Sequence, residues 1–141
     1  MLRNIPKIIP PELVKTMMEM GHSDVLIIAD ANFPGTAHAK KIIRMDGIMI
    51  PELLEAVLQL FPLDNFIENP VRLMRNLPTE PVPEIWETYR ELLKKYDKDD
   101  AFHDFEFIDR LPFYKTAEAF VIVQTGDESR YGNIILQKGV C

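Results

Sequence analysis

The stretch Glu19-Met20-Gly21-His22-Ser23-Asp24-Val25-Leu26-Ile27-Ile28-Ala29-Asp30 decides the fold. Its five apolar residues, Val25 to Ala29, lie between polar ones, a pattern typical of a short strand covered on both faces. His22 precedes this strand and Asp30 follows it. Ligands of open parallel sheets bind beyond the carboxyl ends of such strands. Asp30 therefore stands where a ligand is expected.

Outward from this strand, helical and extended patterns alternate to the end of the chain. Apolar residues at helical spacing, with prolines near several first turns, predict helices over residues 12–20, 36–40, 52–60 and 84–96, and a short helix from Pro112 that carries Phe113 and Ala117. Short apolar runs predict strands over residues 25–29, 41–45, 71–74, 105–108, 120–123 and 133–136. The alternation predicts an α/β fold, a three-layer sandwich with a largely parallel or mixed central sheet. No repeat or shift in composition marks a boundary, so we expect residues 1–141 to form one domain.

The charge balance argues against two classes of partner. With 16 Lys and Arg against 22 Asp and Glu, the formal net charge is -6. Such a chain has no general attraction to phosphate backbones or anionic lipid surfaces. We therefore expect no nucleic acid and no membrane among its partners.

Apolar runs and cysteine content indicate the compartment. The longest apolar runs are far shorter than the roughly 20 residues that cross a bilayer, and no secretion signal is recognisable, so we expect a soluble protein. The single cysteine, Cys141, excludes an intrachain disulfide and a multi-cysteine metal site. A reducing, cytoplasmic setting is the natural expectation.

Familiar catalytic motifs are absent from the sequence. There is no glycine-rich phosphate loop, no serine between paired glycines and no His-Glu-x-x-His zinc helix. A metal set would have to combine His22, Asp24, Asp30 and His38, which follow no repeated ligand spacing. We predict no metal and no cofactor. His38 stands in a polar loop and is predicted to be a surface residue.

His22 and Asp30 are the first candidates for chemistry. His22 follows the end of the first predicted helix, whose partial negative charge favours the protonated imidazole, so it could exchange protons near neutrality. The alternative is a histidine that only caps the helix or binds a local carbonyl. Asp30 is a carboxylate that directly follows a buried apolar run, so it must be hydrated, paired or turned toward a ligand. The alternative is that Asp30 only caps a helix or forms a turn.

A second group of candidates lies in the last third of the chain: Arg110, Tyr114, Tyr131 and Asn133. Together they supply donors, acceptors and an aromatic face, which suit a polyhydroxylated ligand. Taken singly, Arg110 could pair with a surface acid, Tyr114 could belong to the core and Asn133 could form a turn.

Seven segments carry a longer pattern: Ile9–Leu13, Glu19–Asp24, Asp30–Pro34, Arg44–Gly47, Phe113–Tyr114, Val123–Gly126 and Tyr131–Val140. Together they resemble the family of L-fucose mutarotases and D-ribose pyranases, small isomerases of sugar rings, essentially from end to end. The least similar part is Val82–Phe105. The resemblance implies the fold of that family, a cofactor-independent reaction and ring-shaped homo-oligomers, often decamers, with the site near a subunit interface.

The resemblance also implies roles for single residues. The histidine matching His22 is the proton donor, and the residues matching Asp30, Arg110, Tyr131 and Asn133 hold the sugar. At position 110 this chain resembles the fucose branch of the family, whereas the ribose branch tends to carry histidine there.

The resemblance bears on two further positions. Tyr114 is a candidate wall of the sugar site, and relatives often carry histidine in place of Asn32.

These roles predict a sugar mutarotase that interconverts the α and β anomers of L-fucose by acid/base-assisted ring opening and closure. Ribose and galactose are other sugars to consider. The alternatives are D-ribose pyranase activity, which uses the same ring opening, and a non-catalytic monosaccharide-binding assembly protein.

The predicted strand also poses a geometric question. His22 and Asp30 stand at its two ends, so about 16 Å of strand separates their backbones. Either loops fold back over the sheet, or the sugar is held by groups from two subunits.

Overall fold

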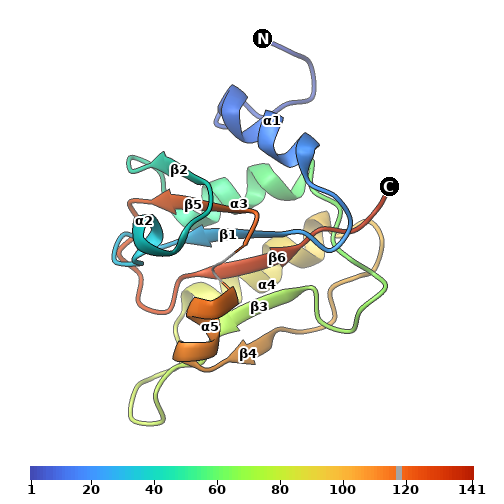
Figure 1. The fold of residues 1–141 in the computed structure, drawn as a ribbon. Coiled ribbons are helices and arrows are strands. Elements are labelled where there is room, and N and C mark those ends of the chain that lie inside the picture. The colour runs from blue at the N-terminus through green and yellow to red at the C-terminus, as the bar shows by residue number, and fades with distance from the viewer. Residues whose placement is uncertain (117–118) are drawn as a thin grey trace.

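A computed structural model describes residues 1–116 and 119–141. Its elements in chain order (Figure 1) are α1 (Pro11–Glu19), β1 (Val25–Ala29), α2 (Gly35–His38), β2 (Ile42–Met45), α3 (Ile50–Leu58), β3 (Val71–Met74), α4 (Ile85–Tyr96), β4 (Glu106–Ile108), α5 (Arg110–Thr116), β5 (Val121–Thr125) and β6 (Ile134–Gln137). Ala117, which the sequence predicts on the last helix, lies outside the described residues. Within the described part of the chain, no helix is both long and apolar enough to span a membrane.

The strands form one six-stranded sheet in the order β2-β5-β1-β6-β3-β4. β1, β2 and β5 are parallel to one another, and β3 is parallel to β4, whereas β6 runs antiparallel to both of its neighbours, β1 and β3. The carboxyl ends of five strands and the amino end of β6 therefore lie at one end of the sheet, here called the Asp30 end. The opposite end, where β1 begins, is called the His22 end.

Side chains of β1 alternate between two hydrophobic layers. Leu26 and Ile28 pack with residues of α1, α3 and α4, whereas Ile27 and Ala29 pack with Phe33 and with Phe113 of α5. In Figure 1, α3 and α4 lie behind the sheet and α2 and α5 lie in front of it. This confirms the predicted three-layer α/β sandwich with a mixed sheet, and it explains why the strand reads as a continuous apolar run.

The end of α1 leads toward β1 without a glycine cap. Met18 lies on the outer face of α1 and is 82% exposed, whereas Met17 and Met20 are buried in the core. The main-chain N–H of Gly21 donates to the Asp24 carboxylate at 2.7 Å, and no glycine in the described part of the chain has a positive φ. A short turn, and not a left-handed glycine cap, therefore carries His22 toward β1.

Gly126 allows β2 and β5 to end side by side. It follows β5, and its main-chain N–H donates to the Ile48 carbonyl at 3.1 Å. A Cβ atom at position 126 would overlap with the main-chain carbonyl of Asp46, which follows β2. Close approach of two backbones therefore requires glycine here.

We predict that Gly126→Ala lowers the free energy of unfolding by about 1–3 kcal/mol, because the backbone at Asp46 would have to move. Urea unfolding measures this change. Gly47→Ala is the matched control, since a Cβ there meets nothing within 4 Å. Equal unfolding midpoints for the two variants would contradict this account of Gly126.

Candidate functional site

The Asp30 end of the sheet holds a hollow of about 260 Å³, here called the Asp30 pocket. Its lining comes from the loops and helices that follow the strands: Asp30, Asn32, Phe33, Met74, Arg110, Tyr114, Ser129, Arg130, Tyr131 and Asn133. All five residues expected from the sequence to surround a sugar are among them. The pocket thus collects side chains that are about 100 positions apart in the chain.

The antiparallel direction of β6 brings Asn133 to Asp30. Ile28 of β1 is paired with Ile134 of β6, so the residue before β6 lies opposite the residues that follow β1. The Asp30 main-chain N–H donates to Oδ1 of Asn133 at 2.7 Å, and both residues are buried. With its oxygen engaged, Asn133 has its amide nitrogen to offer a ligand as a donor.

Strand β5 fixes the same backbone from the other side. The Gln124 side-chain amide donates to the Asp30 carbonyl, and the Thr125 hydroxyl donates to the Ala29 carbonyl at 2.8 Å. Both side chains are buried. The sequence offered no chemical signal for these two residues, which appeared only within a family-like segment.

The Asp30 carboxyl group lies in a largely dry environment. Its exposed fraction is only 6%, and it accepts the Asn32 main-chain N–H at 3.0 Å. Burial raises the pKa of Asp30, the Asn32 and Phe33 main-chain N–H groups partly offset the rise, and the nearby charge of Asp127 adds to it. The burial that makes the pocket side chain selective for a hydrogen-bonding partner therefore also disfavours the charged form of this carboxyl group.

Tyr114 of α5 forms an aromatic wall of the pocket. The Arg110 guanidinium carbon lies 5.6 Å from the centre of the Tyr114 ring. The His38 ring stacks on the same tyrosine, with 5.3 Å between ring centres and 7° between planes. His38 is exposed, as the sequence predicts, but the sequence did not indicate that it contacts the wall.

Tyr131 is held by two hydrogen bonds, one at its main chain and one at its side chain. Its backbone is left-handed, with φ of 56°, and its carbonyl accepts the Trp86 indole N–H at 2.9 Å. Its hydroxyl donates to the carboxylate of Glu80, and this hydrogen bond is the main reason that the pKa of Tyr131 is raised. The ring therefore borders the pocket while its hydroxyl is engaged elsewhere.

His22 lies at the opposite end of the sheet, beside a buried acid. Its Nε2 atom is 3.1 Å from Oδ1 of Asp64, whose side chain is fully buried. The Phe66 main-chain N–H and the Gln137 side-chain amide each donate to the same carboxylate at 3.0 Å. Burial raises the pKa of Asp64, but the hydrogen bonds from Phe66, His22 and Gln137 outweigh it and hold the pKa below its usual value.

Asp64 thus presents an ionised carboxylate to the imidazole and fixes the orientation of its ring. Asp64 was not among the residues predicted from the sequence. The available signal was the one that identified Asp30, a carboxylate that directly follows apolar residues, here Phe61 to Leu63.

Within one chain, His22 does not reach the Asp30 pocket. Strand β1 separates His22 from Asp30 by about 16 Å of backbone. His22 does not line the pocket, and its ring is bonded to Asp64 at the other end of the sheet. Strand β1 also separates the members of the alternative metal set, since His22 and Asp24 precede it whereas Asp30 and His38 follow it. Residues 1–116 and 119–141 contain no group of three or more acids, histidines or cysteines that could hold a metal ion.

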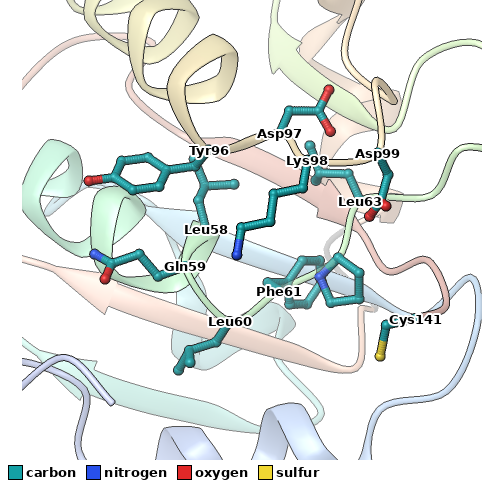
Figure 2. A pocket seen from close by; sticks show the side chains of 11 residues that line it. Leu58, Gln59, Leu60, Phe61, Leu63, Tyr96, Asp97, Lys98, Asp99 and Cys141 are labelled. Carbon is teal, nitrogen blue, oxygen red and sulfur yellow. The ribbon is translucent and has the colours of Figure 1, made fainter. Parts of the chain in front are cut away.

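A different hollow of about 270 Å³ lies between the ends of α3 and α4 and the last residues of the chain. Figure 2 shows the Lys98 side chain extending into it above Phe61, with Cys141 at its rim. It contains none of the residues predicted from the sequence to act on a ligand. The candidate functional groups therefore belong to the Asp30 pocket and to the His22–Asp64 pair.

The chain matches a known family over nearly its whole length. The profile of the RbsD / FucU transport protein family covers residues 3–141. A fucose mutarotase of Danio rerio is 43% identical, over 99% of this chain and 94% of the relative. An L-fucose mutarotase of Actinobacillus pleuropneumoniae is 39% identical, over 99% of this chain and 97% of the relative.

Solved structures agree with these matches. The fucose mutarotase of Streptococcus pneumoniae in complex with L-fucose superposes with a TM-score of 0.93, at 43% identity and with 99% of each chain covered. RbsD of Bacillus subtilis complexed with D-ribose superposes with a TM-score of 0.71 over 94% of this chain and 95% of RbsD. At 19% identity, this second likeness concerns the fold alone.

We predict that Asp30→Asn raises the free energy of unfolding at pH 7. Because burial raises the folded-state pKa of Asp30, ionisation disfavours the folded state at every pH above the unfolded value of about 3.8. The increase in the free energy of unfolding that the neutral amide gives is then complete above the folded-state pKa. It disappears as the pH falls below the pKa of the unfolded state. Urea unfolding at several pH values measures it.

The exposed Asp99→Asn variant controls for the general effect of exchanging an acid for an amide. An Asp30→Asn variant that is less stable than the parent at pH 7, or whose gain increases toward acid pH, would contradict the assigned cause of the pKa shift.

Proposed function

The chain belongs to the RbsD / FucU family, and we propose that it is a carbohydrate isomerase that interconverts the α and β anomers of L-fucose. One observation carries this proposal above the others. The polar groups that would hold a sugar, from Asp30, Arg110 and Asn133, line one pocket in a chain that matches an L-fucose-bound mutarotase over 99% of its length.

The reaction requires only proton transfers. The anomeric hydroxyl must lose a proton while the ring oxygen gains one; the ring opens, the aldehyde end turns, and the ring closes on the other face. We assign the proton transfer to His22, with Asp64 fixing the orientation of its ring. Catalysis by one well-placed acid or base is worth about 10²–10⁴-fold.

The Asp30 pocket supplies the binding groups in this proposal. The Asp30 carboxyl accepts hydrogen bonds from sugar hydroxyls, and the Arg110 guanidinium and the Asn133 amide donate to sugar oxygens. Tyr114 and Tyr131 provide aromatic walls against the apolar faces of the ring. No group outside the protein and the sugar takes part in these steps.

Because the two groups of residues lie at opposite ends of one sheet, we propose that the active site is assembled from two copies of the chain. His22 and Asp64 of one copy would face the Asp30 pocket of the next. Exposed apolar side chains lie beside both halves and support this arrangement: Phe66, 70% exposed and 5.2 Å from the His22 ring, and Leu111, 71% exposed and next to Arg110. A homo-oligomer, such as a ring-shaped decamer, would bury them.

D-ribose pyranase activity is supported less well. It would use the same ring opening, but the likeness to RbsD rests on the fold. Arginine at position 110 and relatives at 39–43% identity favour L-fucose. For the compartment we propose the cytoplasm, where the single Cys141 would stay reduced.

We predict that the protein accelerates exchange between the anomeric proton signals of L-fucose and that His22→Ala slows this exchange by about 10²–10⁴-fold, because the acid/base group is lost. Saturation-transfer proton NMR measures the rate, and D-ribose and D-galactose are compared in the same way.

His103→Ala is the matched control, because His103 is exposed and does not line the Asp30 pocket. Equal rates for His22→Ala and the parent would show that His22 is not the acid/base group. Exchange no faster than in buffer, with L-fucose bound, would favour a non-catalytic binding protein.

We further predict complementation between two inactive variants. His22→Ala retains Arg110, and Arg110→Ala retains His22, so a site between unlike copies can contain both residues. Random mixing of equal amounts by co-expression should restore about a quarter of the sites.

Mixing the two purified variants without subunit exchange is the control and should restore nothing. If co-expressed variants stay as inactive as each one alone, His22 and Arg110 act within the same copy, and the two-copy site is wrong.

A further inference from the structure

A second hollow adjoins the Asp30 pocket. It measures about 300 Å³, and its lining includes Glu80, Pro83, Glu84, Ser129, Arg130 and Tyr131. The two hollows share the residues Ser129 to Tyr131. We call this segment the partition, because it stands between the pocket and the second hollow.

The carboxylate of Glu80 holds both large side chains of the partition. One of its oxygens accepts the hydrogen bond from the Tyr131 hydroxyl, and the other forms an ion pair with the Arg130 guanidinium. The guanidinium carbon in turn lies 5.8 Å from the centre of the Tyr131 ring. Glu80 is mostly buried, with 19% of its side chain exposed, whereas 76% of the Arg130 side chain is exposed.

Glu80 is itself held in place by a short, proline-rich loop. Its main-chain N–H donates to the Leu77 carbonyl at 3.0 Å, and the Asn76 side chain donates to the carbonyls of Glu80 and Pro81 at 3.1 and 3.3 Å. Prolines restrict the loop further, since each fixes its own φ. The loop therefore fixes the position from which the Glu80 carboxylate bonds to the partition.

The backbone and the side chains of the partition are fixed by different elements. Helix α4 holds the backbone, because the Trp86 indole and the Tyr89 hydroxyl donate to the carbonyls of Tyr131 and Gly132. No bond from α4 fixes the Tyr131 ring direction in the described part of the chain. The ring packs against both hydrophobic layers, and Glu80 accepts the hydrogen bond of its hydroxyl, so loss of Glu80 would return rotamer freedom to the ends of two long side chains.

We propose that Glu80 is a positioning residue for the sugar site: it holds Tyr131 and Arg130 in the partition and so keeps the Asp30 pocket to the size of a monosaccharide. This inference rests on the proposed sugar mutarotase function. Glu80 acts through the partition and does not touch the sugar. Its loss should weaken binding while leaving the proton transfer at His22 intact.

The first test separates binding from turnover. Glu80→Ala should raise KM for L-fucose about tenfold, the value of one hydrogen-bonded contact, and leave kcat within about threefold of the parent. The KM of Glu80→Gln should lie between those of the parent and of Glu80→Ala. Its amide oxygen can still accept the hydrogen bond from Tyr131, but the neutral amide cannot pair with the charge of Arg130. Glu84→Gln, an exposed glutamate of the same second hollow, is the matched control.

The second test needs no catalysis. The hydrogen bond to Glu80 is the main cause of the raised pKa of Tyr131, so Glu80→Ala, which removes this bond, should lower that pKa. Ultraviolet absorbance at alkaline pH reports tyrosine ionisation, and subtraction of the Tyr131→Phe curve isolates the Tyr131 signal. Glu84→Gln should leave the Tyr131 curve unchanged.

The two readouts distinguish the possible failures. If the parent shows no anomer exchange, the proposed function fails. The tyrosine titration still tests whether Glu80 holds the Tyr131 hydroxyl. An unchanged KM in Glu80→Ala, a loss confined to kcat, or an unchanged Tyr131 titration in Glu80→Ala would each overturn the role assigned to Glu80.

Discussion

The hydrogen bond from the Asp30 main-chain N–H to the Asn133 side chain is the contact on which the candidate site depends. It exists because β6 runs against its neighbours, so its amino end meets the carboxyl end of β1. The loop before β6 carries the partition, and that loop is thereby delivered to the Asp30 pocket. Buried hydrogen bonds from Gln124 and Thr125 then fix the opposite side of the same backbone.

Strand β6 also reaches the second group of candidate residues, His22 and Asp64. Asn133 precedes β6 and bonds to Asp30, whereas Gln137 ends β6 and donates to Asp64, the partner of His22. A packed strand cannot shorten, so the rigidity that orders both groups also keeps them apart within one chain. The histidine proposed as the acid/base group and the pocket proposed to hold the sugar are each fixed by the sheet, yet they lie at its opposite ends. This separation is the physical argument for proposing a site shared between copies.

Sequence reasoning succeeded where burial determines the pattern and failed where a loop determines the contact. The bounds of β1 follow from five apolar residues that are covered on both faces. The meeting of Asp30 with Asn133 depends on the antiparallel direction of β6, which an alternation of helices and strands does not specify. Asp64 and Glu80 were missed because each is one acid among many in the sequence, and only its partners in space distinguish it. The roles assigned to Arg110 and Tyr131 came from the family resemblance, since composition and spacing alone left them open.

A crystal structure of the assembled protein with L-fucose tests the two-copy site most directly. The account predicts that the sugar contacts Asp30 and Arg110 of one copy while Nε2 of His22 from a second copy lies within about 3.2 Å of the anomeric or ring oxygen. A bound sugar whose anomeric oxygen contacts no His22, or contacts His22 of the copy that supplies Asp30, would contradict it.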